Sequence, residues 1–185
     1  MDVRVERTRR SLQDALLDLA RERPLDEVTV AEIAARAGVN RSSFYQHYSE
    51  KETLLADALD AAAEAAAATL PGHYEPPSGP PQALVQFLQH IDEHAELYRS
   101  VFGGTGSTAV LARLRARIEA IVREGLVSSP TPAYEGVPLD VIAAGITGSA
   151  LGVVEAWLMR DPRPSVEVGA EWVWRALLGP GGSWA

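Results

Sequence analysis

Two histidines in the middle of the chain have the spacing of metal ligands on a helix. His90, Glu93 and His94 form an H-x-x-E-H pattern, in which the two imidazoles lie one helical turn apart. That pattern is the signature of inverted zinc metalloproteases. Several downstream carboxylates leave the final ligand unidentified, and the Gly/Pro-rich loops assemble no obvious substrate cleft. We therefore expect that the protein is not an enzyme and binds no metal and no cofactor. A zinc-dependent hydrolase that uses His90, Glu93 and His94 is kept as an alternative.

Other catalytic patterns are absent from the sequence. The chain has no cysteine, which excludes thiolate zinc sites, iron–sulfur clusters, disulfides and cysteine nucleophiles. No Ser-His-Asp spacing, phosphate-binding loop or nucleotide fingerprint is present. The glycines of the GGTGS segment follow a predicted helix rather than a strand, which excludes a Rossmann site.

A second group of polar side chains has the chemistry of base and phosphate recognition. Arg41 and Ser42 open a predicted helix, whose first N–H groups and partial positive charge favour a phosphate or a base acceptor. Arg41 can bridge O6 and N7 of a guanine, while Ser42 and Ser43 can bond to bases or to phosphate. The same exposed side continues with Tyr45, Gln46 and His47.

The net charge requires any contact with nucleic acid to be local. The 185 residues include 17 basic and 25 acidic ones, a formal charge of −8, so the overall field does not attract nucleic acid. The first 52 residues carry 9 Arg or Lys against 10 Asp or Glu. The excess negative charge therefore lies in the C-terminal part.

The polar residues at 41–47 need a scaffold, and helical periodicity predicts one. Apolar residues recur at i, i+3, i+4 and i+7 over residues 12–19, which predicts a helix over residues 6–23. Thr29 and Glu32 then form a capping box for a short second helix.

The third and fourth helices have start signals of their own. Asn40 is a good cap for a third helix that runs through Tyr48, with Phe44 and Tyr48 turned toward the core. The sequence SEKE at 49–52 is another capping box, and it opens a helix that runs to Leu70. Three helices thus precede a long connecting one, and a glycine-containing turn joins the second to the third.

These signals occur together in the string TVAEIAARAGVNRSSFYQHYSEKETLLADAL, which resembles the N-terminal DNA-binding domain of the TetR family of bacterial transcriptional regulators. The resemblance covers about residues 7–60. Its diagnostic parts are the Thr-capped helix with Ile-Ala, the Ala-Gly-Val turn, the Phe-Tyr-x-His-Tyr run and the Lys-Glu-x-Leu-Leu entry to the fourth helix. The resemblance implies a helix-turn-helix domain over residues 1–52 and a helical effector-binding and dimerisation domain over residues 53–185.

The resemblance also implies a function and assigns contacts. It implies a regulator, usually a repressor, that a small-molecule effector releases from a palindromic or near-palindromic operator. The family's pattern places Tyr45 and His47 on DNA, and Thr29 and Lys51 on phosphates. Together with the helix opening, the predicted DNA-contacting residues are Thr29, Arg41, Ser42, Ser43, Tyr45, Gln46, His47 and Lys51. Thr29 would cap a helix and Tyr45 could pack at a core edge without any DNA. A second alternative is a helical adaptor without DNA binding, which would explain the apolar C-terminal helices but not the arrangement of Arg41, Ser43, Tyr45, His47 and Lys51.

Helical patterning returns after the Pro-rich segment at 71–81, which we predict to be the main loop. Further helices are predicted at 82–101, with a bend near Glu93, and at 108–126, 139–160 and 165–178. Since no segment alternates with a period of two, we expect an all-α fold of about nine helices.

The last two predicted helices have the composition of a dimer interface. Small residues follow one side of the helix from Leu139, namely Gly145, Gly148, Ser149, Gly152 and Ala156. The final helix adds Trp172, Trp174 and Leu178. We expect a homodimer formed by these two helices.

An aromatic and polar stripe in the middle helices predicts either core packing or a ligand cavity. The family's architecture implies an effector cavity there, for a small and partly apolar molecule. The predicted effector-binding residues are Phe87, His90, His94, Tyr98, Phe102 and Trp157.

The sequence predicts no membrane segment. The opening MDVRVERTRR lacks the apolar core of a signal peptide. The longest apolar run, Val141 to Val154, has 14 residues, which is too short to span a bilayer. We therefore expect a cytoplasmic protein that does not contact a membrane.

Overall fold

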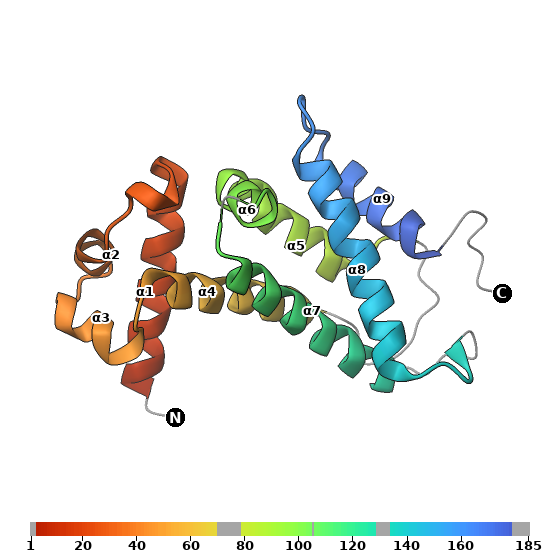
Figure 1. Cartoon of the computed structure of the whole chain (residues 1–185), viewed down its shortest axis with the longest axis horizontal. Coiled ribbons are helices and arrows are strands. Elements are labelled where there is room, and N and C mark those ends of the chain that lie inside the picture. Colours follow the sequence, from red (N-terminus) through yellow and green to blue (C-terminus); the bar gives the residue numbers. More distant parts are fainter. Residues whose placement is uncertain (1–2, 70–78, 105, 129–133, 179–185) are drawn as a thin grey trace. The chain divides into compact units, whose positions relative to one another are not determined.

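The structure, a computed structural model, describes residues 3–69, 79–104, 106–128 and 134–178. Over these ranges it contains nine α-helices, one short 3₁₀ helix and no strand, which confirms the predicted all-α fold. The elements are α1 (Val3–Glu22), η1 (Leu25–Glu27), α2 (Val30–Arg36), α3 (Arg41–His47), α4 (Lys51–Ala67), α5 (Gln82–Glu93), α6 (Ala95–Phe102), α7 (Thr108–Ser128), α8 (Leu139–Leu158) and α9 (Val166–Leu178) (Figure 1). The predicted Pro-rich loop lies almost entirely outside the described residues.

The chain forms two compact units. Unit 1 consists of residues 1–61 and 93–113, and unit 2 of residues 62–92 and 114–185. The predicted bend is confirmed, because α5 ends at Glu93, His94 leaves the helical conformation with φ −119° and ψ 35°, and α6 follows. The chain therefore passes from unit 2 into unit 1 at this bend. The boundary at residues 52 and 53 remains a prediction.

Unit 1 is built on the apolar faces of its first helices. The helix α1 packs against α2 and α6, and α2 packs against α3. The core side chains that are almost completely buried include Leu12, Leu16, Ile33, Phe44, Leu54 and Leu59. Truncating one such leucine to alanine costs about 2–5 kcal/mol. This packing is what fixes the short helices α2 and α3, which are too short to be stable alone.

Unit 2 is held together by the pair α8 and α9, around a buried tryptophan. Trp157 is 0% exposed, and its indole Nε1 donates to the carbonyl oxygen of Pro164 at 3.0 Å. Gly169 of α9 lies against the same ring, since a Cβ there would be 2.9 Å from indole atoms of Trp157 and 3.0 Å from Leu88 Cδ2. The missing side chain of Gly169 therefore lets α9 approach α8 closely. Nearby, the guanidinium of Arg160 lies 5.0 Å from the ring centroid of Trp172.

The helix α8 is longer and more apolar than the 14-residue run indicates. The helix has 20 residues, and by length and composition alone it could cross a membrane. Its most apolar stretch of 18 residues has a mean hydropathy of 1.6, and 39% of that stretch is buried inside the protein. The prediction considered only the uncharged run, whereas the complete helix passes the test of length and composition, as the core helices of soluble proteins also do. The packing of α8 against α9 makes it a partly buried core helix.

Candidate nucleic-acid interface

A capping residue organises the start of α3. The side-chain oxygen Oδ1 of Asn40 accepts three hydrogen bonds, from Ser43 N at 2.7 Å, Ser42 Oγ at 2.6 Å and Ser43 Oγ at 2.9 Å. The predicted cap is confirmed. Because both hydroxyl protons point at Asn40, the two serine oxygens are left as acceptors, which suits the amino groups of bases.

The turn before α3 depends on one glycine. Gly38 has φ 70°, a left-handed conformation that other residues rarely adopt. Val39 N then donates to Ala34 O at 2.9 Å, which closes the end of α2. The turn sets α2 and α3 against each other as a helix-turn-helix.

The predicted capping box of α2 is confirmed. Thr29 N donates to Glu32 Oε2 at 2.9 Å, and Glu32 N donates to Thr29 Oγ1 at 3.3 Å. The hydrogen bonds from Thr29, and then the one from Arg23, lower the pKa of Glu32 to about 2. The Thr29 side chain therefore has a definite structural role at the N-terminus of α2.

The helix α3 presents one polar face and buries the other. Phe44 and Tyr48 are buried, as predicted. Four of the predicted DNA-contacting side chains on this helix are exposed (Arg41, Ser42, Tyr45 and Gln46), and two are half-buried (Ser43 and His47). Tyr45 is 49% exposed, so its ring lies at the surface, although its inner edge meets the ring of Phe44 at a centroid distance of 5.3 Å.

Arg41 and Tyr45 are presented together. The guanidinium carbon of Arg41 lies 5.7 Å from the centroid of the Tyr45 ring, and Arg41 Nη2 donates to the Tyr45 hydroxyl at 3.3 Å. The ring limits the conformations of a long, flexible cation. A preordered guanidinium loses less conformational entropy when it binds.

Lys51 has an intramolecular role that its place in the sequence does not indicate. Its Nζ donates to the carbonyl oxygen of Leu25 and, at 2.8 Å, to that of Val28. These carbonyls belong to η1 and the residue after it, so the ammonium fixes the connection between α1 and α2. An ammonium has three N–H donors, so one remains for another acceptor.

The capping box predicted at Ser49 was wrong. The helix α4 begins at Lys51, which places Glu50 rather than Ser49 at the capping position. The Ser49 hydroxyl lies 3.3 Å from Thr53 Oγ1 instead.

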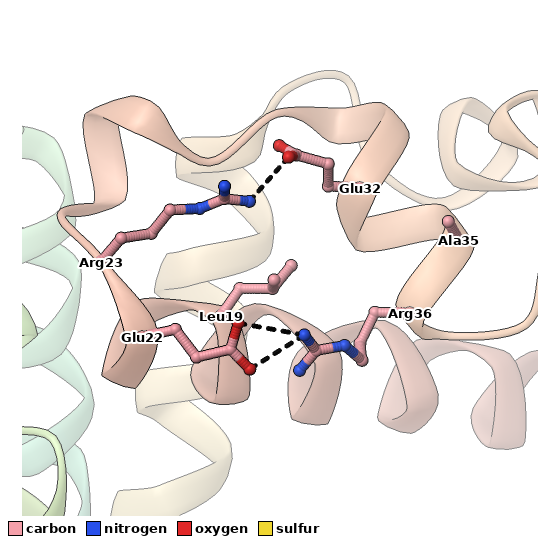
Figure 2. A pocket seen from close by; sticks show the side chains of 6 residues that line it. All are labelled: Leu19, Glu22, Arg23, Glu32, Ala35 and Arg36. Atoms are coloured by element: carbon pink, nitrogen blue, oxygen red, sulfur yellow. Dashed lines mark hydrogen bonds and ion pairs between the residues drawn. The ribbon is translucent and has the colours of Figure 1, made fainter.

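An open pocket of about 540 Å³ lies between the end of α1 and α2. Figure 2 shows its two ion pairs, Arg23 with Glu32 at 2.7 Å and Arg36 with Glu22 at 2.9 Å. The charges in the pocket are therefore compensated pairwise, and they brace α2 against α1. None of the predicted effector residues lines this pocket.

The predicted effector residues are divided between the two units. His94, Tyr98 and Phe102 belong to unit 1, whereas Phe87, His90 and Trp157 belong to unit 2. In unit 1 the rings of Tyr98 and Phe102 are buried and stacked, with centroids 6.2 Å apart. In unit 2, Trp157 supports the packing of α9. Burial is therefore the shared property of Tyr98, Phe102 and Trp157.

The surroundings of His94 are unsuited to a metal ion. Its Nε2 lies 3.2 Å from Arg21 Nη2, and Arg21 also pairs with Glu93 at 2.9 Å. Burial, and then the nearby positive charge of Arg21, lower the pKa of His94 to about 4. No group of three or more potential ligands that could hold a metal occurs among the described residues. The structure therefore gives the zinc-hydrolase alternative no support.

Comparisons with known proteins match this arrangement. The family described as "Bacterial regulatory proteins, tetR family" matches residues 12–58. A curated relative, an uncharacterized HTH-type transcriptional regulator YxbF of Bacillus subtilis, is 43% identical over 56 residues. That match covers 30% of this chain and only 15% of the relative.

Solved structures extend the similarity to nearly the whole chain. A tetR-family transcriptional regulator from Streptomyces coelicolor is 27% identical, with a TM-score of 0.56, over 96% of this chain and 82% of the other. Thermus thermophilus FadR, a TetR-family repressor solved with lauroyl-CoA, is 20% identical, with a TM-score of 0.61, over 94% of this chain and 100% of the other. The second likeness concerns the fold alone.

Proposed function

The chain belongs to the TetR family of bacterial regulatory proteins, and on that premise we propose that it is a transcriptional repressor. It binds operator DNA as a homodimer in the cytoplasm and leaves the operator when a small molecule binds. The observation that carries the proposal is the polar, exposed face of α3 behind a Gly38 turn. TetR-family transcriptional regulators are non-enzymatic, so the chain acts by binding.

In this proposal α3 lies in the major groove of DNA. Arg41, held over Tyr45, donates to a guanine, and the oxygens of Ser42 and Ser43 accept from amino groups of bases. Gln46 and His47 extend the contact along the same face. The remaining donor of Lys51 binds a phosphate on one side of the groove. Thr29 binds one on the other side when its hydroxyl turns to the phosphate from Glu32 Oε2, to which it donates at 2.7 Å in the structure.

The DNA contacts are tested by selecting bound fragments from random or genomic DNA and measuring affinity for the recovered site. Arg41→Ala should weaken that site about 10- to 100-fold and relax the preference at one base pair in each half-site. Arg115→Ala is the matched control, because it removes an equally charged, exposed arginine of α7. If Arg41→Ala binds as well as Arg115→Ala over a range of salt concentrations, the contact assignment is wrong.

The homodimer is supported by the outer face of α8. Val141 is 56% exposed, and Gly145, Ser149, Gly152 and Ala156 are exposed as well. Because these residues are small, two copies of α8 could approach closely. A dimer would also present two copies of α3 to successive major grooves, about 34–36 Å apart.

The assembly is tested by sedimentation at micromolar concentration, which should give about twice 19.9 kDa. Gly148→Leu should weaken association. No atom lies within 4 Å of a Cβ added at Gly148, so the side chain can leave the helix without a clash at its first carbon, and an unchanged melting temperature would show that its effect is intermolecular. Gly125→Leu, at an equally open glycine of α7, is the control. A stable monomer that binds an inverted repeat tightly would contradict the proposal.

We propose that a small, partly apolar effector contacts one of the two groups of predicted residues, either His94, Tyr98 and Phe102 of unit 1 or Phe87, His90 and Trp157 of unit 2. The lauroyl-CoA of the FadR structure, a ligand of a protein with this fold, combines an apolar acyl chain with a charged CoA group. Such a molecule acts only if it binds the DNA-incompetent state several kcal/mol more tightly than the competent one.

The effector is sought by adding acyl-CoA thioesters and small aromatic compounds to the protein–operator complex and following fluorescence anisotropy of the DNA. Tyr98→Phe removes one buried hydroxyl and should reduce release by an active compound while leaving operator affinity unchanged. Release that is unaffected by every substitution at the six residues would contradict the site.

A further inference from the structure

One carboxylate on α4 collects donors from three other parts of unit 1. Asp57 accepts from Arg9 Nη2 at 2.9 and 2.7 Å, from Gln13 Nε2 at 2.8 Å and from the Tyr48 hydroxyl at 2.6 Å. It also accepts from Arg113 Nη2 at 3.1 Å. The Asp57 side chain is only 14% exposed. Although burial alone would raise the pKa of Asp57, the hydrogen bonds from Tyr48 and Arg9 keep it below its ordinary value.

Tyr48 connects this carboxylate to the helix that carries the DNA-contacting residues. Its backbone N–H donates to Phe44 O at 2.9 Å and closes the C-terminal end of α3. Its ring is 3% exposed, and its hydroxyl also accepts from Arg9 Nε at 3.3 Å. Burial, and then the bond to Asp57, raise the pKa of Tyr48 to about 12, so the hydroxyl keeps its proton at neutral pH. Asp57 therefore holds the end of α3 opposite to the Asn40 cap.

Arg113 connects the same carboxylate to α7. Its Nε donates to Asp60 at 2.7 Å while its Nη2 reaches Asp57. Arg113 is the last residue of unit 1 on α7, and the helix continues from Leu114 as part of unit 2. Asp57 therefore bonds both to Tyr48, at the end of α3, and to Arg113 of α7, a helix whose residues are divided between the two units.

We propose that Asp57 is a positioning residue for DNA recognition, which fixes the C-terminal end of α3 through Tyr48 and is itself held by Arg113 of α7. The inference rests on the proposed function. Recognition requires the side chains of α3 to be held within about 0.5 Å of their productive positions. The packing of Phe44 limits how closely α3 can approach the core of unit 1. The directed hydrogen bond from Tyr48 to Asp57 limits how far α3 can tilt. A displacement of α7 that withdraws Arg113 removes a charge-assisted bond from Asp57 and loosens that limit.

The experiment compares Tyr48→Phe and Asp57→Asn with Asp60→Asn in the full-length chain. Tyr48→Phe deletes a single hydroxyl and keeps the ring, so it remains informative if Asp57→Asn does not fold. Asp60→Asn is the matched control, because Asp60 accepts from the same Arg113, whereas the Tyr48 hydroxyl donates to Asp57. Each variant is measured for amide hydrogen exchange of residues 41–48 without DNA, and for affinity toward the selected operator and toward random DNA.

We expect Tyr48→Phe to speed exchange of residues 41–48 at least threefold and to lower the operator-to-random affinity ratio about tenfold, with an unchanged salt slope. Asp60→Asn should stay within twofold of wild type in both measurements. If Tyr48→Phe leaves the amide exchange of residues 41–48 unchanged, the bond between Tyr48 and Asp57 does not fix α3. If exchange is faster but the operator-to-random affinity ratio is unchanged, Asp57 has no role in DNA recognition. If the wild-type protein selects no DNA sequence, the proposed function fails, and the exchange measurement alone still decides whether Asp57 fixes α3.

Discussion

Lowering the pH should destabilise the folded protein through His94. The side chain is 6% exposed and lies beside Arg21, and its pKa falls from the ordinary 6.5 to about 4. The folded state therefore keeps a neutral ring at pH values at which the unfolded chain has already bound a proton. The contribution of His94 is fully present above pH 6.5, decreases as the pH falls toward 4, and is constant below that value.

The size of the effect follows from these two pKa values. Between pH 7 and pH 5 the unfolded chain gains most of a proton at this position while the folded protein gains almost none. The loss of unfolding free energy is about 2 kcal/mol. The groups that face the ring are Arg21, which opposes its protonation, and Asp18, which favours it.

The assay is urea unfolding followed by far-ultraviolet circular dichroism at pH 7 and pH 5. His94→Gln keeps a carbonyl oxygen that can accept from Arg21 but does not titrate. Wild type should lose about 2 kcal/mol more than His94→Gln on acidification. His47→Gln, which removes a histidine of α3, should behave like wild type. An equal pH dependence in wild type and His94→Gln would refute the reasoning.

Three substitutions test other contacts. Lys51→Ala removes two bonds to backbone carbonyls and should lower the unfolding free energy by about 2 kcal/mol; if it also binds phosphate, the salt slope of DNA binding falls by about one. An unchanged melting temperature would exclude the structural role of Lys51. Gly169→Ala forces a Cβ against the Trp157 ring and should cost about 1–3 kcal/mol in thermal unfolding, unlike Gly125→Ala. Asn40→Ala removes the cap of α3 and should cost about 1 kcal/mol, with faster amide exchange at the start of that helix; unchanged exchange there would contradict the importance of the cap.

The local features of the fold could be predicted because their signals lie within a few residues. The caps at Thr29 and Asn40 each depend on a side chain and a backbone N–H three residues later. The bend near Glu93 was predicted from sequence and is present. At Ser49 the pattern was equally good, but a local signal does not determine which of two adjacent residues begins the helix.

Interactions between distant residues could not be predicted in this way. The donors to Asp57 are between 9 and 56 residues away in sequence, and nothing about an aspartate in an alanine-rich helix identifies it as an acceptor for them. Lys51 was assigned to a phosphate because the pattern of the family that the sequence resembles places it there, and that pattern does not reveal that two backbone carbonyls bind the same ammonium. Trp157 was grouped with ligand-binding aromatics, since periodicity does not reveal that Gly169 leaves room for its ring.

The burial of Trp157 within unit 2 has a consequence for optical measurements. All four tryptophans belong to that unit, namely Trp157, Trp172, Trp174 and, outside the described residues, Trp184. The segments of unit 1 contain tyrosines but no tryptophan. Indole emission in a denaturation experiment therefore follows unit 2 alone, while circular dichroism follows the helices of both units. Whether the two transitions coincide gives a direct reading, without any attached dye, of how cooperatively the two halves of this chain unfold.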